Sequence, residues 1–278
     1  MGDIINSYIM PHPPIIVPGI GEGRENAASA TIAACRKIAD EIVEDAPTTI
    51  LISSPHAPGF RDFIVISDAS RLIGDFGAFG HPEIFMDFEN NLTLAGEIIK
   101  NAGSVNINAG FLKESEKRQY GITDHLDHGA MVPLFFIGKS FKKSEKHFKI
   151  VHFSTPFLSS DDLYSFGKII RKTISGSDER VVYVASGDLS HRLTYDAPAG
   201  YSPKGKVYDE KLVEIIKNSD SKGILDITEE EMEQAGECGT RSFIILFGTF
   251  DGDKTSTEIY SYEGPFGVGY LAAGIHTL

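Results

Sequence analysis

The chain has 278 residues, 41% of them hydrophobic and 23% charged, a composition typical of a globular protein with a sizeable core. A formal net charge of -13 disfavours nucleic acid and anionic membrane surfaces as partners. With two cysteines, no signal-peptide pattern and no apolar run of bilayer length, we expect a cytoplasmic protein without a disulfide framework.

Strands and helices are expected to alternate along the first half of the chain. Residues 4–10 form an apolar run typical of a strand, and residues 24–46 are alanine-rich with apolar positions at helical spacing. Residues 48–54 are β-branched and apolar, which indicates a buried strand. A further short strand is expected at 63–67, and a helix over 88–103 that ends at glycine.

The alternation continues in the second half, after a polar loop that runs into an apolar segment at 123–138. Thr228 and Glu231 have the spacing of a capping box. Strands are expected at 149–155, 180–186 and 257–262, and helices at 161–175, 207–220, 228–235 and 241–250. No repeat and no linker divides the chain, so the pattern predicts one three-layer α/β/α domain over residues 1–278.

Three histidines share one context in this pattern. His12, His56 and His191 each follow the carboxyl end of a predicted strand within a few residues, with proline or glycine nearby to stiffen or turn the backbone. Ligands of open α/β sheets bind beyond those strand ends. Any one of the three could be an ordinary loop residue, but together they favour one crevice with a metal or catalytic role.

Two further residues are candidates for the same crevice. His128 adjoins glycine and an apolar segment, whereas the nearby His125 fits a surface or helix-capping position equally well. Glu237 follows a glycine and precedes a buried segment, and two histidines with one carboxylate leave open positions on iron. Cys238 is the competing ligand, and its thiolate would favour zinc or copper. No role is expected for the remaining histidines, His81, His147, His152 and His276.

Five short motifs in this order carry a family resemblance: MPHPP, SPHAP, DHLDHGAMVPL, SGDLSH and GECGTRSF. Together they resemble the class III extradiol ring-cleavage dioxygenases of the LigB-like superfamily, and within it the LigB-type domain of AmmeMemoRadiSam system proteins. The resemblance spans nearly the whole chain. It implies a single α/β domain built around a mixed sheet.

The resemblance also implies roles for individual residues. His12 and His56 would bind non-haem Fe(II), Glu237 would complete the triad of ligands, His191 would be the acid/base, and His128 would line the substrate pocket. Zinc or another divalent metal could take the place of iron in purified protein. The implied partners are a small catechol- or aminophenol-like aromatic and O2, and a homo-oligomer is left open.

Two other functions stay open. The turn around Cys238 resembles the Memo branch, in which a cysteine stands at this place, so a metal-binding redox or partner-recognition protein without ring cleavage is one alternative. A hydrolase that activates water on zinc is the other. The chain lacks G-x-S-x-G, a P-loop and a dinucleotide fingerprint, which argues against serine hydrolases and nucleotide enzymes.

Overall fold

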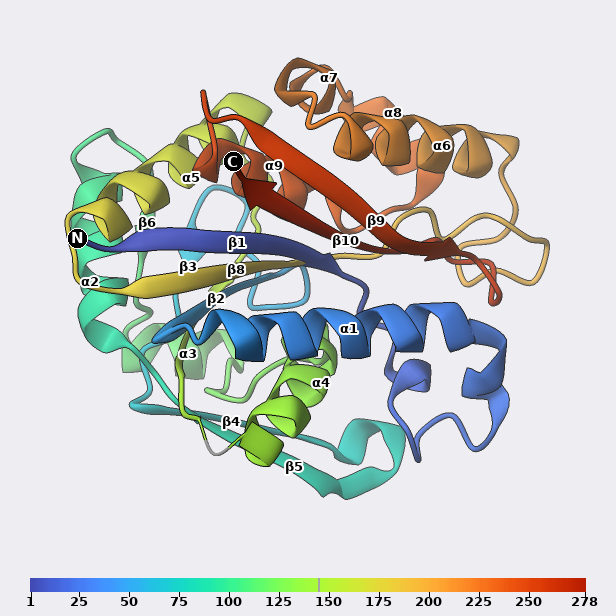
Figure 1. Ribbon diagram of the computed structural model, residues 1–278, viewed down its shortest axis with the longest axis horizontal. Helices are drawn as coiled ribbons and strands as arrows, with labels where there is room; N and C mark the ends of the chain where they lie inside the picture. The colour runs from blue at the N-terminus through green and yellow to red at the C-terminus, as the bar shows by residue number, and fades with distance from the viewer. Residues whose placement is uncertain (145) are drawn as a thin grey trace.

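The computed structural model describes residues 1–144 and 146–278, and its centre is a six-stranded mixed sheet (Figure 1). The strand order is β7-β2-β8-β1-β10-β9. Neighbours among the first four strands run parallel, whereas β10 is antiparallel to both β1 and β9. The bounds are β1 Asp3–Met10, β2 Thr49–Ser54, β7 Lys149–Ser154, β8 Arg180–Ser186, β9 Thr255–Glu263 and β10 Tyr270–Thr277.

Helices cover both faces of this sheet, which confirms the predicted three-layer α/β/α arrangement around a mixed sheet (Figure 1). On one face lie α2 (Leu92–Gly103), α5 (Ser160–Ser175), α6 (Pro203–Lys217) and α9 (Thr240–Thr249). The other face packs against α1 (Ser29–Asp45) and α4 (His128–Ser144). Parallel strands covered on both faces are largely apolar and buried: every residue of β2 is buried, and so is every residue of β8 after Arg180.

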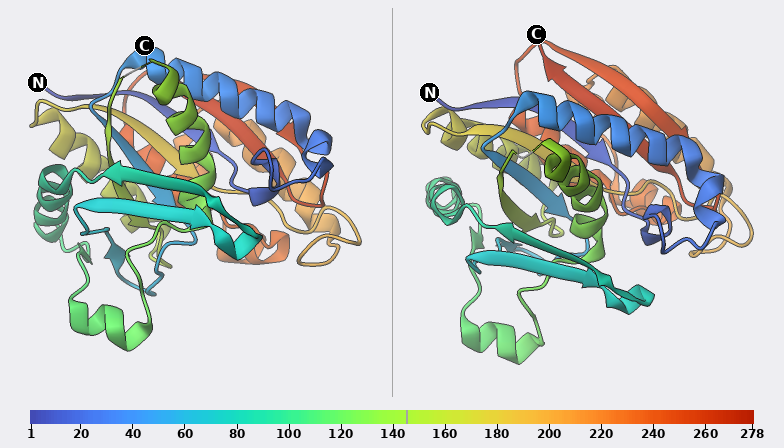
Figure 2. Two further views of the ribbon diagram at one scale, coloured as in Figure 1. Left: turned by 90° about the horizontal axis from the view of Figure 1, so that it is seen from below. Right: turned by 60° about the horizontal axis from the view of Figure 1, so that its bottom comes forward.

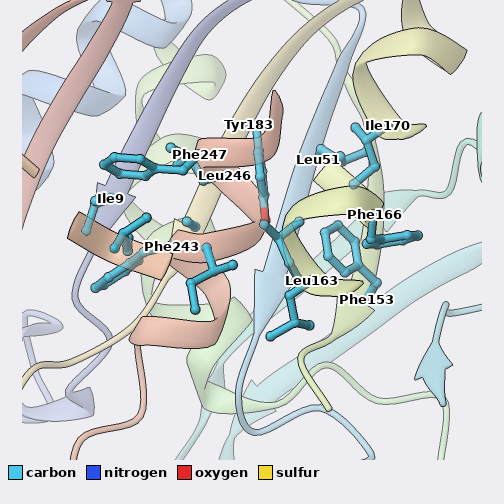
Figure 3. Packing of buried hydrophobic residues seen from close by; sticks show 14 of the residues in the cluster. Ile9, Leu51, Phe153, Leu163, Phe166, Ile170, Tyr183, Phe243, Leu246 and Phe247 are labelled. Carbon is cyan, nitrogen blue, oxygen red and sulfur yellow. The ribbon is translucent and has the colours of Figure 1, made fainter. Parts of the chain in front are cut away.

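Successive residues of a strand point to opposite faces, so each central strand feeds two cores. Leu51 of β2 and Tyr183 of β8 pack into the first core, whereas Ile50 and Val184 pack into the second. Figure 3 shows the first core, in which aromatic and aliphatic side chains of α5 and α9 meet those of the strands. The sheet is therefore held rigidly between two apolar layers, which fixes the positions of its strand ends.

Several predicted boundaries differ from those observed. Residues 24–28 form a 3-10 turn, and α1 begins only at Ser29. The helix expected over 88–103 begins at Leu92 because the side chain of Asn91 caps it by accepting from the amide of Leu94 at 3.1 Å. The strand expected at 63–67 is reduced to β3 (Ile64–Val65), which pairs with β6 (Ala109–Gly110) outside the central sheet.

The remaining elements flank this framework. β4 (Arg71–Phe76) and β5 (His81–Glu89) form an antiparallel hairpin outside the sheet on the side of α4, joined by a 3-10 turn at Gly77–Phe79 (Figure 2). Three further α-helices are short: α3 (Glu114–Tyr120), α7 (Ser221–Leu225) and α8 (Glu229–Ala235). Across residues 1–144 and 146–278, no helix has the length and apolar character needed to cross a membrane.

Candidate metal centre

The structure brings the histidines that follow β1 and β2 to one place. Nε2 of His12 lies 3.0 Å from Nε2 of His56. His128, the first residue of α4, joins them, and one ligand atom from each of the three residues lies within 4.8 Å of the others. This convergence follows from the topology, since β1 and β2 both run parallel to β8 and end at the same edge of the sheet.

The environment of His12 selects its tautomer. Its Nδ1 lies 2.9 Å from Oγ of Ser186, and that hydroxyl donates its proton to the carbonyl of Gly129 at 2.5 Å. Oγ of Ser186 must therefore accept from Nδ1–H of His12. Nε2 of His12 is left with its lone pair directed toward His56, as a metal ligand requires.

All three imidazoles favour their neutral forms. Burial lowers the pKa of His12 well below its usual value, and the neighbouring His56 lowers it further. Loss of surrounding water, with the adjacent His128, lowers the pKa of His56 to about 4. Burial also lowers the pKa of His128. Neutral imidazole is the form that binds metal ions, so the cluster is prepared to bind a cation near pH 7.

The spacing of the donors fits one divalent ion. Two nitrogens that are 3.0 Å apart and each about 2.1 Å from an ion subtend about 90° at it, as neighbouring ligands in octahedral coordination do. His12 is buried and His56 is exposed, so an ion between them would be reachable from solvent. Imidazole donors suit iron, zinc, copper and nickel, so they fit the metal that the resemblance implies without selecting among these ions.

His128 packs against both other histidines. Its ring centroid lies 4.1 Å from that of His56, with the planes tilted by 33°, and 5.6 Å from that of His12. Phe79, at the tip of the β4–β5 hairpin, lies 5.7 Å from His128. The sequence predicts His128 as a pocket-lining residue, and the geometry makes it a candidate third donor as well.

Glu237 and Cys238 occupy different settings at the start of α9. Oε2 of Glu237 accepts from both the amide, at 2.6 Å, and the hydroxyl, at 2.7 Å, of Thr240, so this carboxylate is engaged by the first residue of the helix. Sγ of Cys238 lies 3.6 Å from Nε2 of His12. The structure thus places Cys238, rather than Glu237, beside the histidine cluster, and ligation by Glu237 stays a prediction of the resemblance.

His191 lies after β8 on the same edge, outside the three-histidine group. Burial lowers its pKa, and His56 also acts on it in that direction. The loop that carries it is fixed on both sides: the amide of His191 donates to the carbonyl of Ala235, and the preceding Ser190 donates its amide to Asp209 at 2.8 Å. His191 is therefore a neutral imidazole on a rigid loop.

Three polar residues of the site were not predicted. Asp188 accepts from the amide of His12 at 2.9 Å, and burial raises its pKa to about 7. Asp127 accepts from Oγ of Ser54 at 2.5 Å, and its Oδ2 lies 3.1 Å from Nε2 of the buried His152. Asp127 directly precedes His128 and Asp188 lies in the same loop as His191, which was a usable signal, whereas His152 is a strand residue without one.

The fold and the site together describe a mixed-sheet α/β protein whose histidines converge at the carboxyl ends of parallel strands. The chain belongs to the LigB family: residues 6–273 match the family model described as the catalytic LigB subunit of aromatic ring-opening dioxygenase. Family membership agrees with the resemblance seen in the five motifs.

Known proteins of two kinds are similar to this chain. It is 40% identical over 263 residues to Protein CA_C1420 of Clostridium acetobutylicum. The aligned region covers 95% of this chain and 55% of that protein. It is 27% identical over 145 residues to 3,4-dihydroxyphenylacetate 2,3-dioxygenase of Escherichia coli, with 49% of this chain and 51% of that enzyme covered. The chain thus spans about half the length of these curated relatives.

A solved structure also shares the fold. The crystal structure of the uncharacterized protein JW3007 from Escherichia coli K12 is similar with a TM-score of 0.64, over 97% of this chain and 99% of that one. The sequence identity is 14%, so this likeness supports the fold alone.

Proposed function

We propose that this LigB-family protein is a divalent-metal-dependent extradiol dioxygenase that opens the ring of a catechol- or aminophenol-like aromatic with O2. The observation that carries the proposal is the 3.0 Å separation of the His12 and His56 Nε2 atoms in two neutral imidazoles. The family model and the partial similarity to a dihydroxyphenylacetate dioxygenase support this chemistry.

His12 and His56 would hold the ion, with the third donor coming from His128, Cys238 or Glu237. When bound, a divalent ion such as Fe(II) supplies Lewis acidity that lowers the pKa of a coordinated phenol and leaves open positions for substrate and dioxygen. His128 and Cys238 are supported as the third donor by their short distances to the other histidines, and Glu237 is supported by the family resemblance.

The other side chains of the site suit the substrate. His191 is neutral near pH 7, so its imidazole can accept the proton of a substrate hydroxyl, hold it and return it to the opened product. Phe79 is 40% exposed at the hairpin tip beside His128, where its ring offers an apolar wall for an aromatic substrate.

Oxygen uptake tests the proposal directly. Protein purified without oxygen and loaded with one equivalent of Fe(II) is expected to consume O2 with at least one member of a panel of catechols and aminophenols, forming a ring-opened product. The His191→Ala variant is expected to bind the ion and to lose turnover. Metal binding without oxygen uptake across the panel would contradict ring cleavage.

The position of Cys238 supports one second candidate. A thiol 3.6 Å from Nε2 of His12 suits a softer ion, as expected for a metal-binding redox or partner-recognition protein of the Memo type. Copper or zinc retained through purification, lost in Cys238→Ala and accompanied by no oxygen uptake, is the result that would favour this second function.

A further inference from the structure

All three clustered histidines are connected to the first turn of α4. His128 is itself the first residue of that helix, and Asp127 immediately precedes it. Oδ1 of Asp127 accepts from the amide of Ala130 at 3.2 Å, so Asp127 has the position and the hydrogen bond of a helix cap. Asp127 therefore stabilises the helix start that carries His128.

A second connection runs from Asp127 to His56. Oγ of Ser54, the last residue of β2, donates to Oδ1 of Asp127 at 2.5 Å and accepts from the amide of His56 at 3.2 Å. One hydroxyl thus ties the backbone of His56 to the carboxylate that caps α4. A shift of Asp127 would therefore change the positions of His56 and His128 together.

The third connection reaches His12 through the backbone of the same turn. The carbonyl of Gly129 accepts from Oγ of Ser186, which orients the ring of His12. A side chain at Gly129 would clash with Oγ of Ser54 and would lie 2.9 Å from Oδ1 of Asp127. Only glycine lets the helix end approach the strand end this closely.

The second carboxylate oxygen of Asp127 lies beside His152. This buried imidazole on β7 places Nε2 3.1 Å from Oδ2 of Asp127, and its Nδ1 lies 2.9 Å from Oγ of Ser67. Oδ2 makes no hydrogen bond to that imidazole, so the carboxylate is held through Oδ1, which accepts from both Ser54 and the amide of Ala130. A carboxylate held in this way is suited to orient other groups.

We propose that Asp127, held by Ser54 and by the first turn of α4, is the shared positioning residue of the metal centre, which aligns His56 and His128 for one ion. This inference rests on the metal binding in the proposed function but not on ring cleavage. It predicts that Asp127 acts on the ion through Ser54, without contacting it.

Co(II) binding to the full chain tests this coupling, because Co(II) reports both affinity and ligand geometry through its visible spectrum. Asp127→Ala removes the oxygen that accepts from Ser54 and from the amide of Ala130. We expect its Co(II) affinity to fall by about tenfold, with a shifted visible spectrum. Asp220→Ala, which removes the capping carboxylate of the distant α7, is the matched control and should bind as the wild type does.

A double-mutant cycle separates positioning from general loosening. Ser54→Ala removes the bridge without touching the cap, and it should weaken Co(II) binding in the same direction. If Asp127 acts through Ser54, the double variant will bind about as well as Asp127→Ala alone. Fully additive losses, or a wild-type affinity and spectrum in Asp127→Ala, would overturn the inference while leaving the proposed function intact. Absence of Co(II) binding by the wild type would overturn both.

Discussion

Nε2 of His12 lies 3.0 Å from Nε2 of His56, although the two residues are 44 positions apart in the chain. In the sheet, β8 lies between the strands that carry them, so both side chains reach over the end of β8. The last residue of that strand, Ser186, holds the ring of His12. The candidate site is thus built over one strand end, with its neighbours supplying the donors.

Removal of either of these imidazoles should abolish metal binding. His12→Ala and His56→Ala each delete one of the two facing nitrogens, and we expect at least a 100-fold loss of Co(II) or Fe(II) affinity in titrations of the apoprotein. His191→Ala should bind the ion nearly as the wild type does. His81→Ala, which changes a histidine paired with Glu83 on the hairpin, is the control for loss of an imidazole elsewhere. Retention of metal by His12→Ala would remove the basis of the site.

The third ligand can be assigned by comparing three variants. Because Glu237 accepts two hydrogen bonds from Thr240, the first residue of α9, we expect Glu237→Ala to lower the free energy of unfolding by about 1 kcal/mol while keeping most of the metal affinity. His128→Ala and Cys238→Ala should each lower the affinity more than Glu237→Ala does. Metal content after dialysis measures this order. The reverse order would establish the carboxylate ligand that the family resemblance implies.

The central sheet was predictable because its strands are locally distinctive. The runs before His56 and His191 are continuous and β-branched, as strands buried on both faces must be. β10 was missed since its sequence, YLAAGIHT, is rich in alanine and glycine, which have low strand propensity. Its place between β1 and β9 comes from pairing with distant strands. β5 was missed because most of its residues are exposed or half-buried, and its last residues precede a strongly helical pattern.

The histidines of the site were predictable because they follow strand ends. The side chains that contact them through distant parts of the chain were less predictable. His12 and His56 were expected to share a crevice, and the structure brings them together. The proximity of Asp127 to His152 could not be read from the sequence, because it joins the start of α4 to β7 and depends on how the two elements pack. A buried polar residue in a strand shows its partners only after the fold is known.

Close packing at Gly129 gives a prediction on stability. A methyl group there would clash with Oγ of Ser54, so Gly129→Ala should lower the free energy of unfolding by about 1–3 kcal/mol and weaken Co(II) binding. Gly96→Ala is the matched control, since a Cβ at that position in α2 meets nothing within 4 Å. That control should be stabilised by about 0.5–1 kcal/mol through the higher helix propensity of alanine. Urea unfolding of both variants measures the difference, and equal effects would show that the turn has room for a side chain.

The pH dependence of folding should contain a contribution from Asp209. This fully buried carboxylate on α6 accepts from the amide of Ser190 and from the hydroxyl of Tyr262, each at 2.8 Å, and burial raises its pKa to about 6. Between about pH 4 and pH 6 the folded protein keeps the Asp209 proton while the unfolded chain has released it. The contribution of Asp209 to stability therefore falls as the pH rises through this window, and is constant above it.

Asp209→Asn should remove that contribution without disturbing the loop of His191. The amide oxygen of Asn can accept from Ser190, and its NH2 group can donate to the oxygen of Tyr262, so both contacts survive. We expect the variant to gain stability relative to the wild type, by about 1–3 kcal/mol, as the pH rises from 4 to 7. Urea unfolding across this range measures the gain, with Asp161→Asn, an exposed change of the same charge on α5, as the control. The same pH profile in both variants would show that Asp209 is ionised at little cost in the folded protein.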